Sequence, residues 1–232
     1  DTIIETICAA QLPDGYLNTY FILTGIDKRW TNTFLHEAYC LGHMIEGAIA
    51  YHRATGKNTW LNAAIRFVEH MMSIFGPGKE HWVTGHQELE LALVKLFHHT
   101  GEQRFLDYAE WLINERGHGH MRFDHIGEHR IMDFLKWFIN EHGYDYMLTY
   151  YQDDIPVRQL KKVTGHAVRA MYYYSAIADL VAMSGDMELY GVLLRLWDNV
   201  NPANLYITGG IGQDSQNEGF TKDWHLPNLT AY

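Results

Sequence analysis

Histidines stand beside glycines at the points where helical runs begin. Of the 15 histidines in the chain, three lie in the pairs Gly42-His43, Gly85-His86 and Gly165-His166. An imidazole can donate and accept hydrogen bonds, transfer a proton near neutral pH, or bind a metal ion. His36 precedes His43 by seven residues, so on one helix both would project from the same face. We therefore take these histidines as the first candidates for chemistry.

A second candidate is a carboxyl group near the end of the chain. Glu218 lies beside Gly219 and Phe220, between a glycine loop and Trp224. Aromatic surroundings disfavour the charged form of a carboxyl group, which suits a general acid. Glu37 and Glu88 also accompany the histidines, whereas Glu90 is expected in solvent or in a salt bridge. Aromatic side chains that could pack on a sugar ring are predicted in loops or near helix mouths: Tyr16, Tyr20, Trp82, Tyr172, Tyr206 and Trp224.

Repeated helical hairpins must position these residues. Each Gly-His pair leads into an apolar helical run that closes at a glycine, namely Gly56, Gly101 or Gly185, and a second amphipathic run follows. The pattern predicts hairpins over about 32–54 with 58–74, 86–99 with 102–116, and 165–183 with 186–199. Such units bury their apolar faces by stacking. We therefore expect His43, His86 and His166 at one end of the stack.

The segments between the hairpins give further predictions. Residues 1–12 are predicted to be helical and 16–21 to be extended. Residues 117–163 depart from the repeat and are predicted to be a loop-rich insertion with one short helix around 131–141. Pro202 should end the last helix, because proline lacks an N–H group, and 205–208 should form a short strand.

Antiparallel hairpins with short connections predict an all-α protein with an (α/α) toroid of the six-hairpin-barrel type. The 232 residues, 47% of them hydrophobic, are sufficient for one domain over 1–232 with its own core. The chain starts at Asp1 in mid-helical pattern, so we expect an incomplete barrel. Toroids of this kind are common among sugar-acting enzymes, which is an analogy at the level of fold only.

Composition excludes several partners. A net charge of −10 without a basic stripe argues against nucleic acid. No stretch approaches the roughly 18 apolar residues of a membrane span. Cys8 and Cys40 are too few for a disulfide framework, and Cys40 is expected to be buried among apolar helix positions. The sequence leaves cytoplasmic and secreted locations equally open, and it contains no glycine-rich phosphate loop.

The histidines also admit a metal site. Three of them could bind zinc with an open fourth position. No HExxH-type spacing accompanies them, however. A structural interpretation also stays open, in which Gly-His is only a helix-start preference and the ring hydrogen-bonds a neighbouring carbonyl group.

Several longer motifs resemble one family. They are the segments 11–21, from Gln11-Leu-Pro-Asp-Gly-Tyr onward, 36–46, 85–93, 165–170, and 208–232, which runs through Glu218-Gly-Phe-Thr to Thr-Ala-Tyr. In this order and nearly end to end they resemble the bacterial β-L-arabinofuranosidases. The resemblance implies a retaining exo-glycosidase on an α/α barrel that releases terminal L-arabinofuranose from plant glycans.

The resemblance also assigns roles. Glu218 matches the family's acid/base, while His36, His86 and His166 match its sugar-contacting histidines, with His43 a weaker candidate. The family's nucleophile is a zinc-bound cysteine thiolate. Its zinc ligands follow the Thr-Ala-Tyr at which this sequence ends, so we expect these residues to hold no zinc and to be inactive alone.

Two other functions stay open at this point. One is a non-catalytic carbohydrate-binding toroid that uses the histidines and aromatic side chains for recognition. The other is a sugar epimerase on a similar barrel, with two histidines as acid and base.

Overall fold

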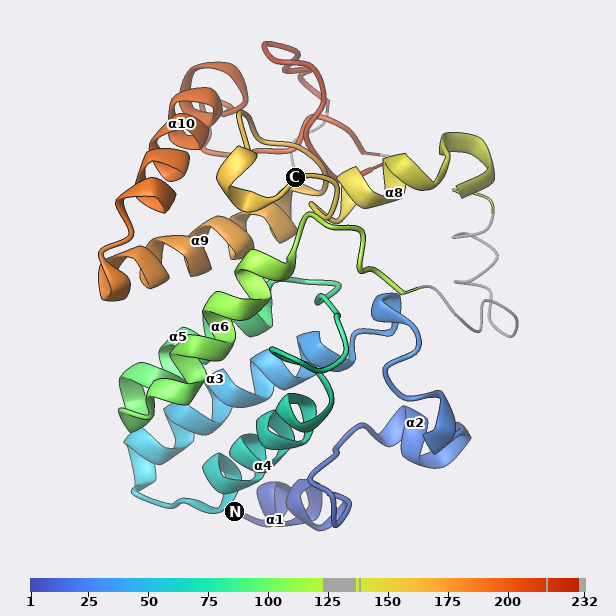
Figure 1. Cartoon of the computed structure of the whole chain (residues 1–232), viewed down its shortest axis with the longest axis vertical. Coiled ribbons are helices and arrows are strands. Elements are labelled where there is room, and N and C mark those ends of the chain that lie inside the picture. Colours follow the sequence, from blue (N-terminus) through green and yellow to red (C-terminus); the bar gives the residue numbers. More distant parts are fainter. Residues whose placement is uncertain (123–136, 138, 216, 230–232) are drawn as a thin grey trace.

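Three helical hairpins form the body of the protein (Figure 1). The computed structural model describes residues 1–122, 137, 139–215 and 217–229. The hairpins are α3 (Glu37–Thr55) with α4 (Thr59–Ile74), α5 (Glu88–Thr100) with α6 (Gln103–Glu115), and α9 (Ala167–Ser184) with α10 (Met187–Ala203). Each turn begins with a glycine in the left-handed region, namely Gly56, Gly101 or Gly185, as the closing glycines predict.

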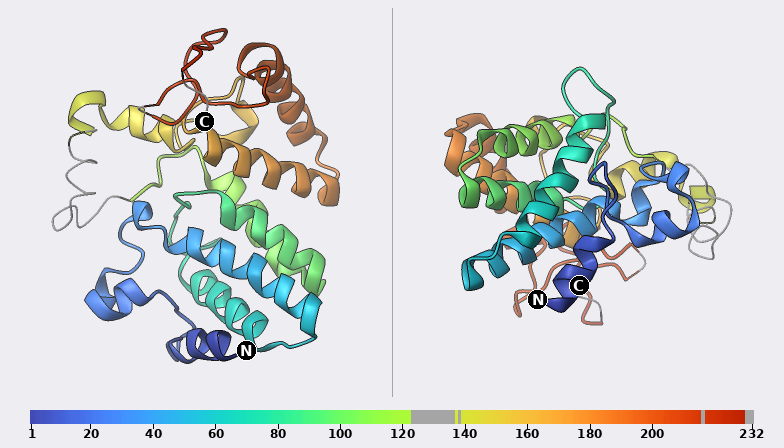
Figure 2. Two further views of the ribbon diagram at one scale, coloured as in Figure 1. Left: turned by 180° about the vertical axis from the view of Figure 1, so that it is seen from behind. Right: turned by 90° about the horizontal axis from the view of Figure 1, so that it is seen from below.

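The first helices of the hairpins lie side by side. α5 packs between α3 and α9, while α4, α6 and α10 each pack against the first helix of their own hairpin. Both views in Figure 2 show this succession of hairpins. Consecutive hairpins arranged in this way form part of an α/α toroid. The described residues contain isolated β-bridges but no β-strand. The predicted all-α fold is confirmed.

Apolar side chains between α3, α5 and α9 make the core. Leu41, Leu89 and Ile177 are buried on these three helices. A Cβ atom at Gly42 would lie 2.7 Å from Cγ of Glu88, so a glycine allows α3 and α5 to approach closely here. The close approach of the helices brings their N-terminal ends together as well.

The first helix of the first hairpin, α3, begins later than predicted. Asn32 caps a short 3-10 helix (Thr33–Leu35) by accepting a hydrogen bond from the N–H of Phe34 at 3.0 Å. His36 then adopts a left-handed conformation, and this conformation separates the 3-10 turn from α3. Gly42 and His43 therefore lie inside α3. The histidine at the start of this helix is His36.

Other segments also differ from prediction. Thr19–Thr24 forms a helix, α2, where an extended segment was predicted, because the side chain of Asn18 caps its N–H groups. α10 continues through Pro202 to Ala203, and 205–208 contains a turn at 207–208 rather than a strand. The expected helix at 1–12 is α1 (Thr2–Ala9). Most of the helix predicted around 131–141 lies outside the described residues.

Short elements fill the connections. η1 (Ile26–Lys28) follows α2, while α8 (Tyr144–Tyr150) and η3 (Val157–Gln159) lie between the second and third hairpins. The assignment of 117–163 as an insertion stays a prediction. Among the described helices, none combines the length and apolar character needed to cross a bilayer.

Candidate active site

Three imidazoles, one from each hairpin, lie close together where α3, α5 and α9 begin, and we call this end of the hairpins the rim. His36 immediately precedes α3, His86 lies two residues before α5, and His166 is the N-cap of α9. The ring centroids of His36 and His86 are 4.8 Å apart, and those of His86 and His166 are 6.2 Å apart. The side-by-side packing of α3, α5 and α9 thus brings together residues that are far apart in the sequence.

Backbone hydrogen bonds hold Glu218 against this rim. The N–H of Ala167 donates to the carbonyl oxygen of Glu218 at 3.0 Å, and the N–H of Phe220 donates to that of Gly165 at 2.8 Å. A Cβ atom at Gly219 would lie only 2.2 Å from the carbonyl oxygen of Gly165, so only glycine fits there. Glu218 itself has a positive φ, a conformation that its neighbours must enforce.

The side chains of His166 and Glu218 form a direct hydrogen bond. Nδ1 of His166 accepts from the N–H groups of Val168 at 3.1 Å and Arg169 at 3.4 Å. In a neutral ring the proton therefore sits on Nε2, which donates to Oε2 of Glu218 at 3.0 Å. Burial, and then the charge of Arg169, lower the pKa of His166 to about 3, so the ring is neutral at physiological pH. The helix start thus determines the tautomer.

The surroundings of Glu218 differ from those expected. Its side chain is 44% exposed. Phe220 is buried in the core, whereas Trp224 is largely exposed. An aromatic enclosure is therefore not what positions this carboxylate; the bond from His166 is.

One arginine links the rim to the core. Arg169 is buried, and its Nε–H donates to the carbonyl oxygen of Gly85 at 2.9 Å. Its guanidinium lies 4.7 Å from the ring centroid of Tyr150 and 4.5 Å from that of Tyr151. Burial, followed by the charge of Arg169, lowers the pKa of both His36 and His86. All three imidazoles are thereby kept neutral, with one N–H donor and one nitrogen acceptor each.

His43 belongs to a neighbouring group. Its exposed ring lies 4.5 Å from Tyr39 and 6.5 Å from Tyr172, and its Nδ1 is 3.4 Å from Oε1 of the buried Glu88. Burial, and then the nearby Glu46, raise the pKa of Glu88 to about 8. Tyr39 also packs on His86, with 4.6 Å between centroids, and so connects this group to the rim.

Two other glutamates are structural. Glu37 accepts hydrogen bonds from the Tyr16 hydroxyl and from the N–H of Trp30 at 2.8 Å, and burial raises its pKa to about 7. Glu90 forms the expected salt bridge, to Arg116 at 3.3 Å, but the pair is fully buried.

Several predicted positions are corrected. Tyr16 and Trp82 lie in loops, but their side chains are buried in the core and are not available to a sugar. Cys40 is exposed, not buried, because it falls on the outward face of α3. Arg169, Tyr39 and Tyr150 are the rim residues that sequence reasoning missed. Arg169 stands in the same motif as His166, and Tyr39 follows His36 by one helical turn, so their spacing was the available signal.

The chain's cysteines and rim histidines do not build a metal site. Among the described residues, two groups bring three ligand atoms within 4.8 Å of one another, His81 with Glu115 and His120, and His43 with Glu46 and Glu88. Neither contains a cysteine, His36, His86 or His166. The three-histidine zinc hypothesis is thus not supported within the described part of the chain. We derive no catalytic step through a metal.

Neutral imidazoles beside a carboxylate at the helix starts of a toroid supply hydrogen-bonding and acid/base groups for a hydroxylated ligand. A family model described as the GH127 catalytic domain of β-L-arabinofuranosidase matches residues 1–232. The chain belongs to this family.

Known relatives agree with this assignment. The chain is 37% identical over 239 residues to the non-reducing end β-L-arabinofuranosidase of Bifidobacterium longum subsp. longum, covering 100% of this chain and 36% of that protein. The crystal structure of a GH127 β-L-arabinofuranosidase from Geobacillus stearothermophilus T6 superposes with a TM-score of 0.87 at 42% identity, over 100% of this chain and 36% of that one. A second solved structure, a GH127 β-arabinofuranosidase, gives a TM-score of 0.82 at 35% identity, over 100% and 34%.

The match is confined to part of each relative. The chain spans about a third of the length of the relatives it matches.

Proposed function

We propose that this chain supplies the acid/base and sugar-recognition part of an exo-acting β-L-arabinofuranosidase. The enzyme would release terminal L-arabinofuranose, with retention, from arabinose-containing oligosaccharides or glycopeptides of plant origin. The observation that carries the proposal is the hydrogen bond between His166 and Glu218 beside the rings of His36 and His86. The sugar is inferred from the relatives, which are β-L-arabinofuranosidases.

Glu218 is proposed as the general acid/base. In the first step its carboxyl group protonates the leaving glycosidic oxygen, and in the second its carboxylate takes a proton from the attacking water. The neutral Nε2–H of His166 donates to Oε2 in the charged state. That leaves Oε1 to carry the transferred proton.

His36, His86 and His166 are proposed to bind the sugar. A furanose ring presents hydroxyl groups that both donate and accept, which matches neutral imidazoles better than imidazolium ions. Arg169 and burial together lower the pKa of each ring and so keep it neutral. The site can therefore bind an uncharged sugar without any of these histidines changing its protonation state.

The nucleophile is proposed to lie outside these residues. The resemblance assigns it to a zinc-bound cysteine, and zinc would keep that sulfur deprotonated. Neither Cys8 nor Cys40 belongs to a group of potential metal ligands in the described part of the chain. This chain alone should therefore bind the sugar without cleaving it.

A chromogenic β-L-arabinofuranoside tests the proposal. Its hydrolysis should be measured with this chain, with a form extended to the length of the relatives, and with Glu218→Gln in the extended form. We expect turnover from the extended form only, and a loss of about 100- to 10,000-fold in kcat for Glu218→Gln with the native glycan. Comparable, metal-independent turnover by the short chain would refute the assigned mechanism. Binding without cleavage by the extended form would indicate a carbohydrate-binding protein, and an isomerised sugar would indicate an epimerase.

A further inference from the structure

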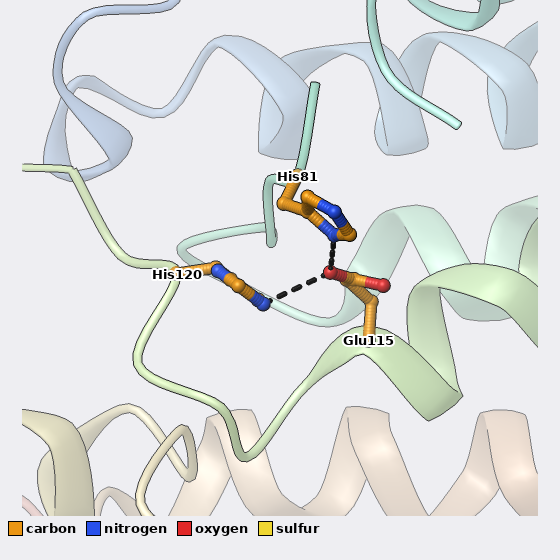
Figure 3. A group of neighbouring side chains, drawn as sticks. All are labelled: His81, Glu115 and His120. Carbon is orange, nitrogen blue, oxygen red and sulfur yellow. Dashed lines mark hydrogen bonds and ion pairs between the residues drawn. The ribbon is translucent and has the colours of Figure 1, made fainter. Parts of the chain in front are cut away.

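We propose that His81, Glu115 and His120 form a binding site for one divalent transition-metal ion, apart from the sugar site and independent of its function. Figure 3 shows the two rings directed at the same carboxylate. Oε1 of Glu115 contacts Nδ1 of His81 and lies 2.9 Å from Nε2 of His120. The three ligand atoms fall within 4.8 Å of one another.

The donor set has a definite chemistry. Two imidazole nitrogens and one carboxylate oxygen are the ligands of many zinc sites and of non-haem iron, and they also suit nickel and cobalt. The ring centroids of His81 and His120 are 5.1 Å apart with 20° between the planes. Without a metal, both nitrogens must direct a proton at one oxygen. A divalent cation would take the place of both N–H donors: each ring would bind it through the lone pair of that nitrogen and carry its proton on the other nitrogen.

The α6 side of the site is held by buried groups. Glu115 is the last residue of α6, and the next residue, Arg116, is fully buried and donates to the carbonyl oxygens of Thr84 and Tyr151 at 2.7 and 2.8 Å. The backbone of Glu115 therefore has little freedom. Its side chain is only 13% exposed, and both of its ion pairs in the described part of the chain are to histidine.

The loop that carries His120 is fixed as well. The N–H groups of Gly117 and Met121 donate to the buried carboxylate of Asp153 at 2.7 and 3.0 Å. A Cβ atom at Gly117, which has a positive φ, would lie 2.2 Å from the backbone nitrogen of Pro156. The loop thus wraps around Asp153 and presents His120 to Glu115.

His81 completes the site from the connection before α5. Its neighbour Trp82 is buried, and the guanidinium of Arg122 donates to the carbonyl oxygen of His81 at 3.1 Å. The His81 side chain is 66% exposed and that of His120 is 29% exposed. An ion can therefore enter from solvent and keep water at its remaining positions.

The other group of potential ligands, His43 with Glu46 and Glu88, is a weaker candidate for a metal site. In that group Glu46 is ion-paired with the ammonium of Lys95, which already supplies a positive charge. Glu88 is buried there beside Glu46, a setting that favours its protonated form. Neither condition applies at Glu115. His43 therefore serves as a control position.

Metal stoichiometry tests the proposal. Full-length protein should be dialysed against micromolar Zn²⁺, and bound zinc counted per chain by elemental analysis. We expect the double variant His81→Gln with His120→Gln to lose one bound zinc per chain. Glu115→Gln should lower the affinity for that zinc about tenfold or more. His118→Gln is the matched control: its ring stacks on His120, but its Nδ1 donates to the Glu115 carbonyl oxygen instead. It should leave the count unchanged, as should His43→Gln.

Thermal melts give an independent readout. Added Zn²⁺ should raise the Tm of the parent and of His118→Gln, but raise it less in the single, surface-exposed variant His81→Gln. An unchanged zinc count in the double variant would overturn the proposal. So would loss of one zinc in His43→Gln alone, because the ion would then lie in the other group.

Discussion

Nε2 of His166 donates a hydrogen bond to Oε2 of Glu218 at 3.0 Å across 52 residues of sequence. The other ring nitrogen caps α9, so one imidazole connects a helix start to a candidate acid/base group. This double use of His166 lets its two roles be separated by mutation.

We expect His166→Asn and His166→Ala to differ in stability but not in activity. Asparagine is a good N-cap and should retain the stability of α9, whereas alanine should cost about 1 kcal/mol. Neither side chain reaches Glu218, so both should lower kcat of the extended enzyme. Chemical denaturation and kinetics on the two variants check this. Wild-type kcat in His166→Asn would contradict the positioning role.

The loop before Phe220 should be intolerant of any side chain at Gly219. A Cβ atom there would collide with the backbone at Gly165, so Gly219→Ala should displace Glu218 and abolish activity. Gly191→Ala in α10 is the matched control, since a Cβ atom there would lie 3.8 Å from its nearest neighbouring atom. It should be neutral or slightly stabilising. Circular dichroism and kinetics on both variants distinguish a local effect from unfolding.

Acid should destabilise the protein by favouring protonation of the rim histidines. The pKa of His166 is about 3 when folded, against an ordinary 6.5. The unfolded chain therefore binds a proton first, and stability is lost as pH falls from about 6.5 toward 3, with a slope of at most about 1.4 kcal/mol per pH unit from this residue. His86 acts in the same direction. In denaturation curves across pH, His166→Asn should flatten this loss.

Glu88 should have the opposite effect. Its folded pKa of about 8 exceeds its ordinary 4.5, so its contribution is present below about 4.5 and is lost as pH rises through 8. Glu88→Gln should therefore reduce the fall in stability between these values. An unchanged slope in the variant would show that Glu88 is already ionised in the folded protein.

An apolar groove between α9 and α10 should cause self-association of the chain. The groove, of about 370 Å³, is lined by residues that include Met171, Leu194 and Trp197, and Trp197 is 65% exposed. Exposed patches of this kind promote association. Light scattering should detect oligomers, and Trp197→Glu should reduce them. Leu23→Glu, at an exposed apolar site on α2, is the control; a monodisperse monomer of the parent chain contradicts the prediction.

Repetition in the sequence predicted the hairpins well, because closing glycines and apolar periodicity are local signals. The start of α3 was placed too early, at about residue 32, because the break at His36 depends on a left-handed residue that no local pattern marks. Pro202 was overrated as a helix terminator, since α10 extends one residue beyond it.

The sequence named candidate site residues but not the contacts between them. The motifs pointed to His36, His86, His166 and Glu218, while the bond between the last two depends on the backbone pairing of His166 with Gly219. Arg169 was missed because burial of a charge beside two tyrosines is a tertiary property. The exposure of Cys40 was likewise invisible, since helical spacing alone does not say which face of α3 is covered.

The most direct test is a crystal structure of the extended Glu218→Gln protein with a β-L-arabinofuranoside. We predict a furanose ring within hydrogen-bond distance of His36, His86 and His166, with its glycosidic oxygen beside residue 218. A bound sugar elsewhere, with these imidazoles untouched, would contradict the account.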